Sequence, residues 1–303
     1  MVDITHKVTT LRTAVAQAIV KVSKPETITA IQNDTVPKGN VFAMSKAAGL
    51  LGVKRTPDIL PDCHPLPIEF TGIEYEVNGL EITVLFTVKT IYKTGVEVEA
   101  MHGASVVALN MYDMLKPIDK GIEIQTIKLL KKKGGKSDFK DTFRKDLKAA
   151  VVVCSDTISS GYKEDKAGKA IIKKLEHCDV KISEYVIIPD EVEHIQQKAK
   201  SYKDQGIDMV IYTGGTGLSG RDVTPEALLP LLERRIPGIE EAIRDYGQER
   251  MPFAMLSRSI AGTIGDTLIL ALPGSTNGAK ESMDAIFPAV LHSFRILKGA
   301  RHD

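Results

Sequence analysis

The chain has 303 residues, 43% of them apolar and 26% charged, which is the composition of a globular protein of about two domains and not of a disordered or fibrous one. No apolar run approaches the roughly 18 residues of a membrane span, and a net charge of +1 argues against broad binding to nucleic acid or to a membrane. The three cysteines show no CxxC spacing and the first residues lack a signal-peptide layout, so we expect a reducing, cytoplasmic location.

The first part of the chain is predicted to be an α+β domain. Helices are expected near Thr10–Val22 and over Val41–Leu51. Two alternating runs then flank Asn78-Gly79, the pair that a type I′ hairpin turn prefers. A helix over Ala100–Lys116 and a strand over Ile122–Leu130 follow. These elements predict an antiparallel sheet with helices packed on one face, as in ferredoxin-like folds.

A highly charged segment with few core-forming residues, Lys131–Lys148, is expected to be a linker. It would separate a domain over residues 1–130 from a second over residues 149–303. Residues 1–148 carry 21 Lys and Arg against 17 Asp and Glu, a net charge of +4. The remaining residues carry 19 against 22, a net charge of −3. This shift in composition is typical of two fused domains.

The second part alternates strands and helices, which predicts a three-layer α/β domain with a mostly parallel sheet. Ligands of such sheets bind in the loops at the carboxyl ends of the strands. The expected strands are Ala149–Cys154, Lys181–Ile188, Asp208–Thr213 and Thr267–Leu272, and the expected helices are Gly168–Glu176, Val192–Gln205, Pro225–Arg234, Ile239–Glu249 and Ala279–Leu297.

Three short motifs of the first domain carry reactive side chains. Cys63-His64 lies between two prolines, and a packed histidine explains it as well as a metal ligand does, because no second pair completes a zinc site. Glu97 and Glu99 share a face if the chain is extended there, which indicates either a ligand between them or a solvated strand edge. Asp113 and Lys116, three apart on a helix, form either an exposed pair of little weight or an inward pair suited to proton transfer.

Together and in this order, the strings VPKGNVFAMSKAAGL, KRTPDILPDCHPL, KTGVEVEAMHGASVVALNMYDMLKPIDKG and KKKGGKS resemble the cyclic pyranopterin monophosphate synthase (MoaC) family over residues 1–137. The resemblance implies conversion of a cyclised dihydro-GTP nucleotide into cyclic pyranopterin monophosphate with release of pyrophosphate. It also implies that Asp113 orients Lys116. Lys38 and Lys116 would be the acid–base lysines, His64, Glu97 and Glu99 would line the same pocket, and Lys54 and Lys136 would contact the phosphates.

This first domain departs from the family pattern at a few positions. Ser45-Lys46 stands where the family usually has Ala-Arg, and a lysine cannot reproduce the bidentate contact of an arginine. Asp62 replaces the usual leucine before Cys-His, and Val98 replaces the methionine between the two glutamates. The expected catalytic set is intact.

The second domain contains a glycine-rich turn, Gly214-Gly215-Thr216-Gly217, directly after a predicted buried strand. Such turns let backbone N–H groups approach a phosphate closely, although no Walker A lysine follows. Asp190 and Asp222 are expected at the same edge of the sheet, which indicates Mg²⁺ held between a carboxylate and a nucleotide. The alternative for Asp190 is that it only caps the helix that follows.

The strings SDTISSG, IPDE, TGGTGLSGRDVTPEA, AMLSRS and LPGSTNGAKE resemble the molybdopterin-binding, MoaB/MogA-type family over residues 148–298. The resemblance implies binding of molybdopterin and its adenylylation with Mg²⁺ and ATP, without a tightly bound organic cofactor. The family's Asp-x-Ser-Gly string reads Asp165–Gly168 here and lacks its hydroxyl. Asp190 and Asp222 would be the catalytic, metal-linked acids, Gly214, Gly215, Thr216 and Gly217 would hold phosphate, and Ser257, Gly274 and Ser275 would contact the ligand.

The combined expectation is a bifunctional enzyme of molybdenum cofactor synthesis that acts on small molecules and not on nucleic acid or membranes. One alternative makes the second half a non-catalytic, pterin-binding scaffold module, and another makes it a general nucleotide hydrolase. The resemblance also implies homo-oligomers with three-fold symmetry. Relatives of the first half form hexamers with sites at dimer interfaces, and relatives of the second half commonly form trimers, so a hexamer is geometrically possible.

Overall fold

A computed structural model describes residues 1–139 and 145–299, without the side chains of Lys136 and Ser137. It contains two compact units, Met1–Asp138 and Phe139–Asp303. No helix among the described residues has the length and apolar character needed to cross a membrane.

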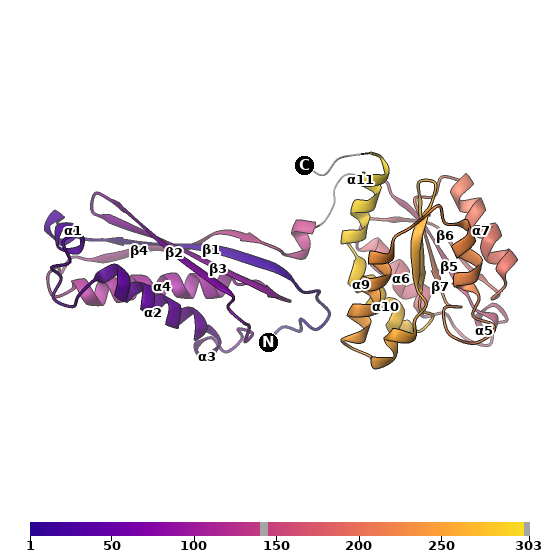
Figure 1. The fold of residues 1–303 in the computed structure, drawn as a ribbon, viewed down its shortest axis with the longest axis horizontal. Coiled ribbons are helices and arrows are strands. Elements are labelled where there is room, and N and C mark those ends of the chain that lie inside the picture. Colours follow the sequence, from indigo (N-terminus) through magenta and orange to yellow (C-terminus); the bar gives the residue numbers. More distant parts are fainter. Residues whose placement is uncertain (140–144, 300–303) are drawn as a thin grey trace. The chain divides into compact units, whose positions relative to one another are not determined.

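The first unit is an antiparallel sheet of four strands in the order β2-β3-β1-β4, with helices on one face (Figure 1). This order joins two β-α-β segments in the ferredoxin-like way, so the predicted fold class is confirmed. The elements are β1 (Thr10–Lys21), α1 (Pro25–Gln32), α2 (Val41–Lys54), α3 (Thr56–Ile59), β2 (Phe70–Asn78), β3 (Glu81–Tyr92), α4 (Glu97–Leu115) and β4 (Glu123–Lys133).

The segment predicted as a helix near Thr10–Val22 is wrong, because it forms strand β1, Thr10–Lys21. Its alanines favour a helix when judged one residue at a time. The side chains nevertheless alternate between buried and partly exposed along the strand, from Arg12 to Val20. Since β1 lies between β3 and β4, its pairing partners on both sides decide the conformation.

The hairpin is present, but its turn is shifted by one residue from the predicted Asn78-Gly79. Asn78 pairs with Glu81, so Gly79 and Leu80 form the two-residue loop. Gly79 has a φ of +59°, whereas Asn78 and Leu80 have no positive φ. A glycine at the first central position is the pattern of a type II′ turn and not of the predicted type I′.

The last strand of this unit enters the segment predicted as a linker. Strand β4 continues to Lys133, and Lys131, Lys132 and Lys133 pair with β1 from Val15 to Thr13. A 3-10 helix over Lys136–Phe139 follows. Exposed lysines are therefore compatible with a strand at the edge of a sheet, where charged side chains also discourage pairing with other chains.

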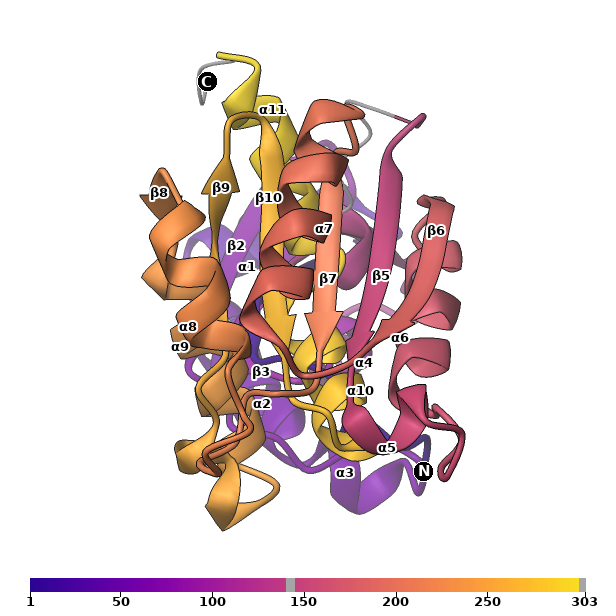
Figure 2. The same ribbon diagram turned by 90° about the vertical axis from the view of Figure 1, so that its right-hand side faces the viewer.

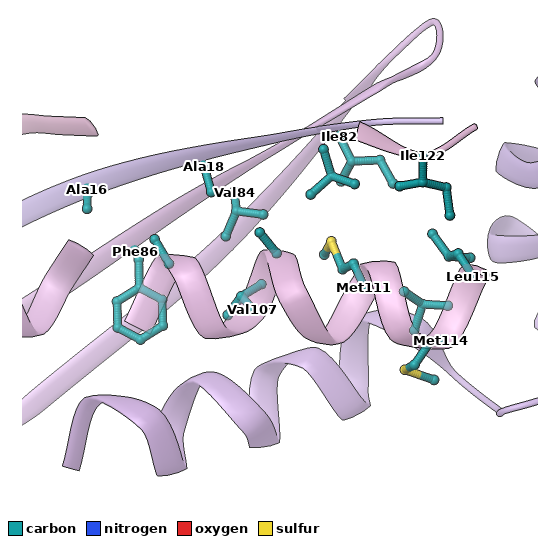
Figure 3. Close-up of a cluster of buried hydrophobic side chains, with 14 of the residues drawn as sticks. Ala16, Ala18, Ile82, Val84, Phe86, Val107, Met111, Met114, Leu115 and Ile122 are labelled. Atoms are coloured by element: carbon teal, nitrogen blue, oxygen red, sulfur yellow. The ribbon is translucent and has the colours of Figure 1, made fainter. Parts of the chain in front are cut away.

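The core of the first unit lies between the sheet and α4 (Figure 3). Ile82, Val84 and Phe86 of β3 are fully buried against Val107 and Met111 of α4. The Phe86 ring lies so close to Gly103 that a Cβ there would be 2.4 Å from its Cζ atom. Truncation of such a buried phenylalanine costs about 3–5 kcal/mol, so this contact fixes α4 on the sheet.

The second unit is a six-stranded sheet in the order β6-β5-β7-β10-β9-β8, covered by helices on both faces (Figure 2). The four strands from β6 to β10 are parallel, as predicted, whereas β9 and β8 are antiparallel additions at one edge. The strands are β5 (Lys148–Cys154), β6 (Lys181–Ile188), β7 (Met209–Thr213), β8 (Arg234–Arg235), β9 (Ile260–Ile264) and β10 (Thr267–Leu272).

One core layer packs α6, α9 and α10 on one face of this sheet, and a second packs α7 and α8 on the other. This is the expected three-layer arrangement. The helices are α5 (Asp156–Ser159), α6 (Ala167–Glu176), α7 (Val192–Asp204), α8 (Thr224–Leu228), α9 (Pro237–Gln248), α10 (Thr276–Ile286) and α11 (Ser293–Leu297), with short 3-10 turns at Leu229–Leu231, Pro252–Leu256 and Ala289–His292.

Two long helices were predicted where shorter ones occur, and two strands, β8 and β9, were missed. The helix predicted over Pro225–Arg234 ends at Leu228, and the one predicted over Ala279–Leu297 ends at Ile286, just before a proline. Strand β9 is a buried, mostly apolar run of five residues that pairs with β10 across Gly265 and Asp266. Short apolar runs of this kind have no period that separates a strand from a loop.

Candidate functional sites

A cluster of two lysines and one aspartate lies at the carboxyl end of α4. The carboxylate of Asp113 accepts hydrogen bonds from Lys116 Nζ and from Lys38 Nζ, both at 2.7 Å. Lys38 also donates to the Asp113 carbonyl oxygen at 2.9 Å. The loop that carries Lys38 is held by a 2.6 Å hydrogen bond from Asn40 to Asp34. Three residues from two distant segments, all predicted as site residues, therefore meet.

This cluster lies at the surface of the unit, contrary to the idea of an inward pair. About half of the Asp113 and Lys116 side chains is exposed, at 51% and 49%. Hydrogen bonds from Lys116 and Lys38 lower the pKa of Asp113 to about 2, and the bond to Asp113 raises the pKa of Lys116. Lys116 is thus a fully protonated acid in this state, and not a lysine neutralised by burial.

A second group lies at the amino end of α4. Glu97 and Glu99 occupy the first turn of this helix, so the prediction that they share one face of an extended segment is wrong. Residues two apart on a helix point in different directions. Glu99 is 2% exposed and accepts a 3.0 Å hydrogen bond from Cys63 Sγ. Burial raises the pKa of Glu99, and burial beside this carboxylate raises the pKa of Cys63 to about 12.

The other residues predicted for the first domain divide between these places. His64 lies beside Cys63, and its Nε2 contacts the Val2 carbonyl at 2.8 Å. Lys54 is the last residue of α2 and is exposed. Two residues further on, the Thr56 hydroxyl lies 3.0 Å from Nδ1 of His102, which belongs to the first half of α4. The side chain of Lys136 is outside the described part of the chain.

Within one chain the two groups are separate. Glu99 and Asp113 are 14 residues apart along α4, which corresponds to roughly 21 Å. Within a single chain the glutamates are therefore far from the Lys116 cluster, and a pocket that His64, Glu97 and Glu99 share with Lys116 stays a prediction. One pocket could contain both groups only if two copies contribute to it.

A basic pocket that the sequence did not reveal adjoins Glu97. Its volume is about 290 Å³, and it is lined by Lys7, Arg12, Lys93, Lys132 and Lys133 together with Glu97 and Asp138. Arg12 is 7% exposed, and its Nε donates to the Tyr92 carbonyl at 3.2 Å. The signal was the alternation of β1, which places a charged side chain on an otherwise apolar face. Such a concentration of cations suits a polyphosphate.

In the second unit the predicted residues converge on one rim of the sheet. Gly214 and Gly215 follow β7 with φ of +101° and +61°. A Cβ on Gly215 would lie 2.3 Å from Thr224 Oγ1 and 2.8 Å from Asp190 Oδ1, so only glycine fits between them. Gly274, in the loop after strand β10, lies so close that a Cβ on it would be 2.9 Å from Gly214 Cα. This close approach of backbones leaves the turn free of side chains.

The two predicted acids lie beside this turn, and four residues outside the predicted set hold them or their loops. Asp190 and Asp156 exchange backbone-to-carboxylate hydrogen bonds of 3.1 and 3.2 Å, and Arg221 donates twice to Asp156, at 2.8 and 3.0 Å. Asp222 accepts from the Ser219 N–H at 2.8 Å. Arg258 donates to the Gly217 carbonyl at 2.8 Å and to the Asp222 carbonyl at 2.5 Å, which ties the turn to the loop after α9.

The charge of these acids fits a divalent cation shared with a ligand. Burial, together with the carboxylates of Asp156 and Asp222, raises the pKa of Asp190, and its Oδ1 is buried with no hydrogen-bond partner among the described residues. Burial alone would raise the pKa of Asp222, but hydrogen bonds from Ser219 and Gly217 outweigh it and lower that pKa. No group of three or more acids, histidines or cysteines in the described ranges could hold a metal alone. Mg²⁺ commonly takes one or two carboxylates and completes its shell with phosphates and water.

A large pocket adjoins the same rim. Its volume is about 830 Å³, and the predicted residues Thr216, Gly217, Ser257, Gly274 and Ser275 all line it. The Ser257 and Ser259 hydroxyls lie 2.9 Å apart, and the Ser275 hydroxyl caps α10 by accepting from the Gly278 N–H at 3.1 Å. The structure therefore brings the predicted second-domain set together within one unit.

Comparison with known proteins assigns each unit to a family. Residues 1–135 match the MoaC family, and residues 150–292 match the family described as a probable molybdopterin binding domain. The chain is 38% identical to a molybdenum cofactor biosynthesis bifunctional protein of Chlorobaculum tepidum, over all of this chain and 96% of that protein. A protein of the same description from Synechococcus elongatus is 36% identical over all of this chain and 98% of its own length.

The first unit alone also has relatives. It is 44% identical to a cyclic pyranopterin monophosphate synthase of Aquifex aeolicus, over 46% of this chain and 54% of that protein. Matches to the full-length proteins cover both units in a single alignment. The chain belongs to the family of bifunctional molybdenum cofactor biosynthesis proteins, in which a MoaC-type synthase unit is fused to a molybdopterin-binding-type unit.

Proposed function

We propose that the first unit converts a cyclised dihydro-GTP nucleotide into cyclic pyranopterin monophosphate, with Lys38 and Lys116 as the acid–base pair. The observation that carries this role is their shared contact with Asp113 at 2.7 Å. A protonated lysine beside a carboxylate can donate a proton to a developing oxyanion and take it back in a later step. Asp113 holds both ammonium groups in place.

The substrate's phosphates are assigned to the basic pocket around Arg12. Five cationic side chains line it, and Glu97 holds one of them, Lys132, at 3.3 Å. The pocket adjoins the amino end of α4 through Glu97. The complete site is proposed to combine this end of α4 with the Lys38–Asp113–Lys116 cluster of a second copy, in an oligomer with three-fold symmetry such as a hexamer.

Replacing Lys116 with alanine tests the first activity. Full-length Lys116→Ala should release pyrophosphate from the cyclic precursor at least 100-fold more slowly, because general acid–base groups contribute about 10²–10⁴-fold. Lys120→Ala, an exposed lysine on the next turn of the chain, is the matched control and should keep the normal rate. Near-normal turnover in Lys116→Ala would refute the assignment.

The second unit is proposed to bind molybdopterin in its large pocket and to adenylylate it. Asp190 and Asp222 would hold Mg²⁺ next to the nucleotide, and the ion would neutralise charge on the phosphates during transfer. The glycine-rich turn would bind phosphate through its backbone N–H groups, and Arg221 and Arg258 keep its neighbouring loops in place. The buried, unpartnered Oδ1 of Asp190 is the observation that supports a cation there.

Incubating the full chain with molybdopterin, Mg²⁺ and ATP tests this second activity. Formation of adenylylated molybdopterin with release of pyrophosphate is expected. Tight pterin binding without product would show a binding module instead, and hydrolysis of a dinucleotide in the absence of pterin would show a nucleotide hydrolase.

A further inference from the structure

The large pocket of the second unit combines three kinds of surface. Its apolar wall contains Ile243 of α9 and the exposed Met251, Phe253 and Leu256 of the following turn. Thr216 and Gly217 connect it to the acids of the rim. An apolar wall of this kind suits a flat heterocycle, and the hydrogen-bonding groups that remain decide which heterocycle is accepted.

Among the lining residues, one side chain is a carboxylate: Glu281 on α10. Gly278 and Ser282 line the pocket on the same face of this helix, at the spacing of one turn. Two arginines, Arg244 and Arg250, also line the pocket. Arg244 contacts Glu240 at 3.9 Å, and Arg250 contacts Glu249 at 3.3 Å. Within the described residues, the Glu281 carboxylate forms no ion pair or hydrogen bond with a side chain or the backbone.

The Glu281 carboxylate is partly exposed, and the two arginines that line the same pocket pair with other glutamates. The Glu281 carboxylate can therefore accept hydrogen bonds from a ligand. A carboxylate offers two acceptor oxygens side by side and no donor. Its complement is a pair of adjacent N–H groups, and the 2-amino-4-oxo edge of a pterin presents such a pair in its amino group and the neighbouring ring N–H. The other polar lining groups include hydroxyls and the amide of Asn277, and neither offers two acceptors in one plane.

We propose that Glu281 recognises the pyrimidine edge of the pterin by accepting hydrogen bonds from its 2-amino group and ring N–H. The inference rests on the proposed pterin-binding role of this pocket and adds the residue that gives it specificity. Phe253 and its apolar neighbours contact the ring faces. A pteridine with oxygen in place of the 2-amino group puts an acceptor opposite the carboxylate, so the same residue excludes it.

A comparison of two fluorescent ligands on the full chain tests the proposal. 6-Hydroxymethylpterin and 6-hydroxymethyllumazine differ in the 2-position, where the lumazine carries oxygen. Fluorescence titration of the wild-type chain should show about 10- to 100-fold tighter binding of the pterin, the discrimination usual for a bidentate contact to a base edge. Glu281→Gln should lose most of this preference, since its amide can donate to the lumazine oxygen. Any pterin binding by the first unit is the same in the wild type and in Glu281→Gln. The difference in preference between these two proteins therefore reports on the second unit alone.

Glu241→Gln is the matched control, because Glu241 is an exposed acid on α9 and does not line the pocket. It should keep the wild-type preference, and both variants should keep the wild-type Tm. A preference retained in Glu281→Gln, or absent from the wild-type chain, would overturn the inference. If neither pteridine binds, molybdopterin replaces them as the probe. Equal affinity of wild type and Glu281→Gln for molybdopterin overturns the role of Glu281 alone, and no binding of molybdopterin overturns the proposed pterin site as well.

Discussion

The two units build their candidate sites in opposite ways. In the second unit, the predicted residues come from several loops at the carboxyl ends of parallel strands, and these loops meet at one rim. In the first unit, the predicted residues lie at the two ends of α4, roughly 21 Å apart. A parallel sheet gathers the ends of its strands within one chain, whereas a helix across an antiparallel sheet separates residues that its sequence places close together.

This difference has a consequence for assembly. The residues predicted for the second site all lie within one unit. The first site needs a second copy if both ends of α4 act on one substrate. The lysine cluster is about half exposed, and in the proposed arrangement it would face the other copy.

The largest expected effect is a rescue by mixing two inactive variants. His64→Ala and Lys116→Ala change opposite ends of α4, so mixed oligomers contain some sites with neither substitution. Co-expression should restore roughly a quarter of the wild-type synthase rate if subunits pair at random and each dimer has two sites. Pyrophosphate release by the purified mixture is the measurement.

The mixture of Lys38→Ala with Lys116→Ala provides the control. Both lysines contact Asp113 of the same chain, so each cluster comes from a single chain. Every chain in this mixture lacks either Lys38 or Lys116, and therefore no site contains an intact cluster. No rescue is expected. Absence of rescue from the His64 and Lys116 mixture, despite demonstrated mixed oligomers, would contradict a composite site.

A smaller effect is expected from an acid of the second unit. Asp222→Asn removes a carboxylate charge proposed to hold Mg²⁺, and should slow adenylylation of molybdopterin by about 100-fold in the full chain. Pterin affinity should stay unchanged, because Asp222 is not among the residues that line the pocket. Glu193→Gln, an exposed acid on α7, is the control. Since this site needs no second chain, mixing Asp222→Asn with Asp190→Asn should give no rescue, and a rescue would break the contrast between the units.

The smallest expected effect is a loss of stability when the loop after Lys116 loses its buried anchor, Asp119. Asp119 is 2% exposed and accepts hydrogen bonds from Ser23, Thr27 and Gly121, which ties the loop after Lys116 to the start of α1. Burial alone would raise its pKa, but these bonds outweigh it and lower the pKa to about 2.

A lowered carboxyl pKa contributes stability above its ordinary value near 3.8 and loses it as the pH falls towards about 2. Asp119→Asn should therefore reduce the free energy of unfolding by about 2 kcal/mol at pH 7, and the difference from wild type should shrink below pH 4. Denaturant titration across this pH range measures it. Asp58→Asn, an exposed acid paired with Arg55, should change little. An unchanged stability in Asp119→Asn would show that the lysine loops do not depend on this anchor.

The sequence by itself determined the two families, the parallel strands and the rim of the second site. A glycine-rich turn, a proline at a helix start and a run of apolar residues are local signals, and they directly predict where β7 ends and α8 begins. The motif residues of the first unit were also identifiable, because uncommon strings recurred in a fixed order.

Only the tertiary structure decided how those residues are grouped. Strand β1 looked helical because alanine favours a helix locally, and its two pairing partners overrode that preference. Because Thr10–Lys21 forms strand β1, the side chain of Arg12 lines the basic pocket. Because α4 begins at Glu97, the side chains of Glu97 and Glu99 point in different directions. These are contacts between segments distant in sequence, and no local pattern records them.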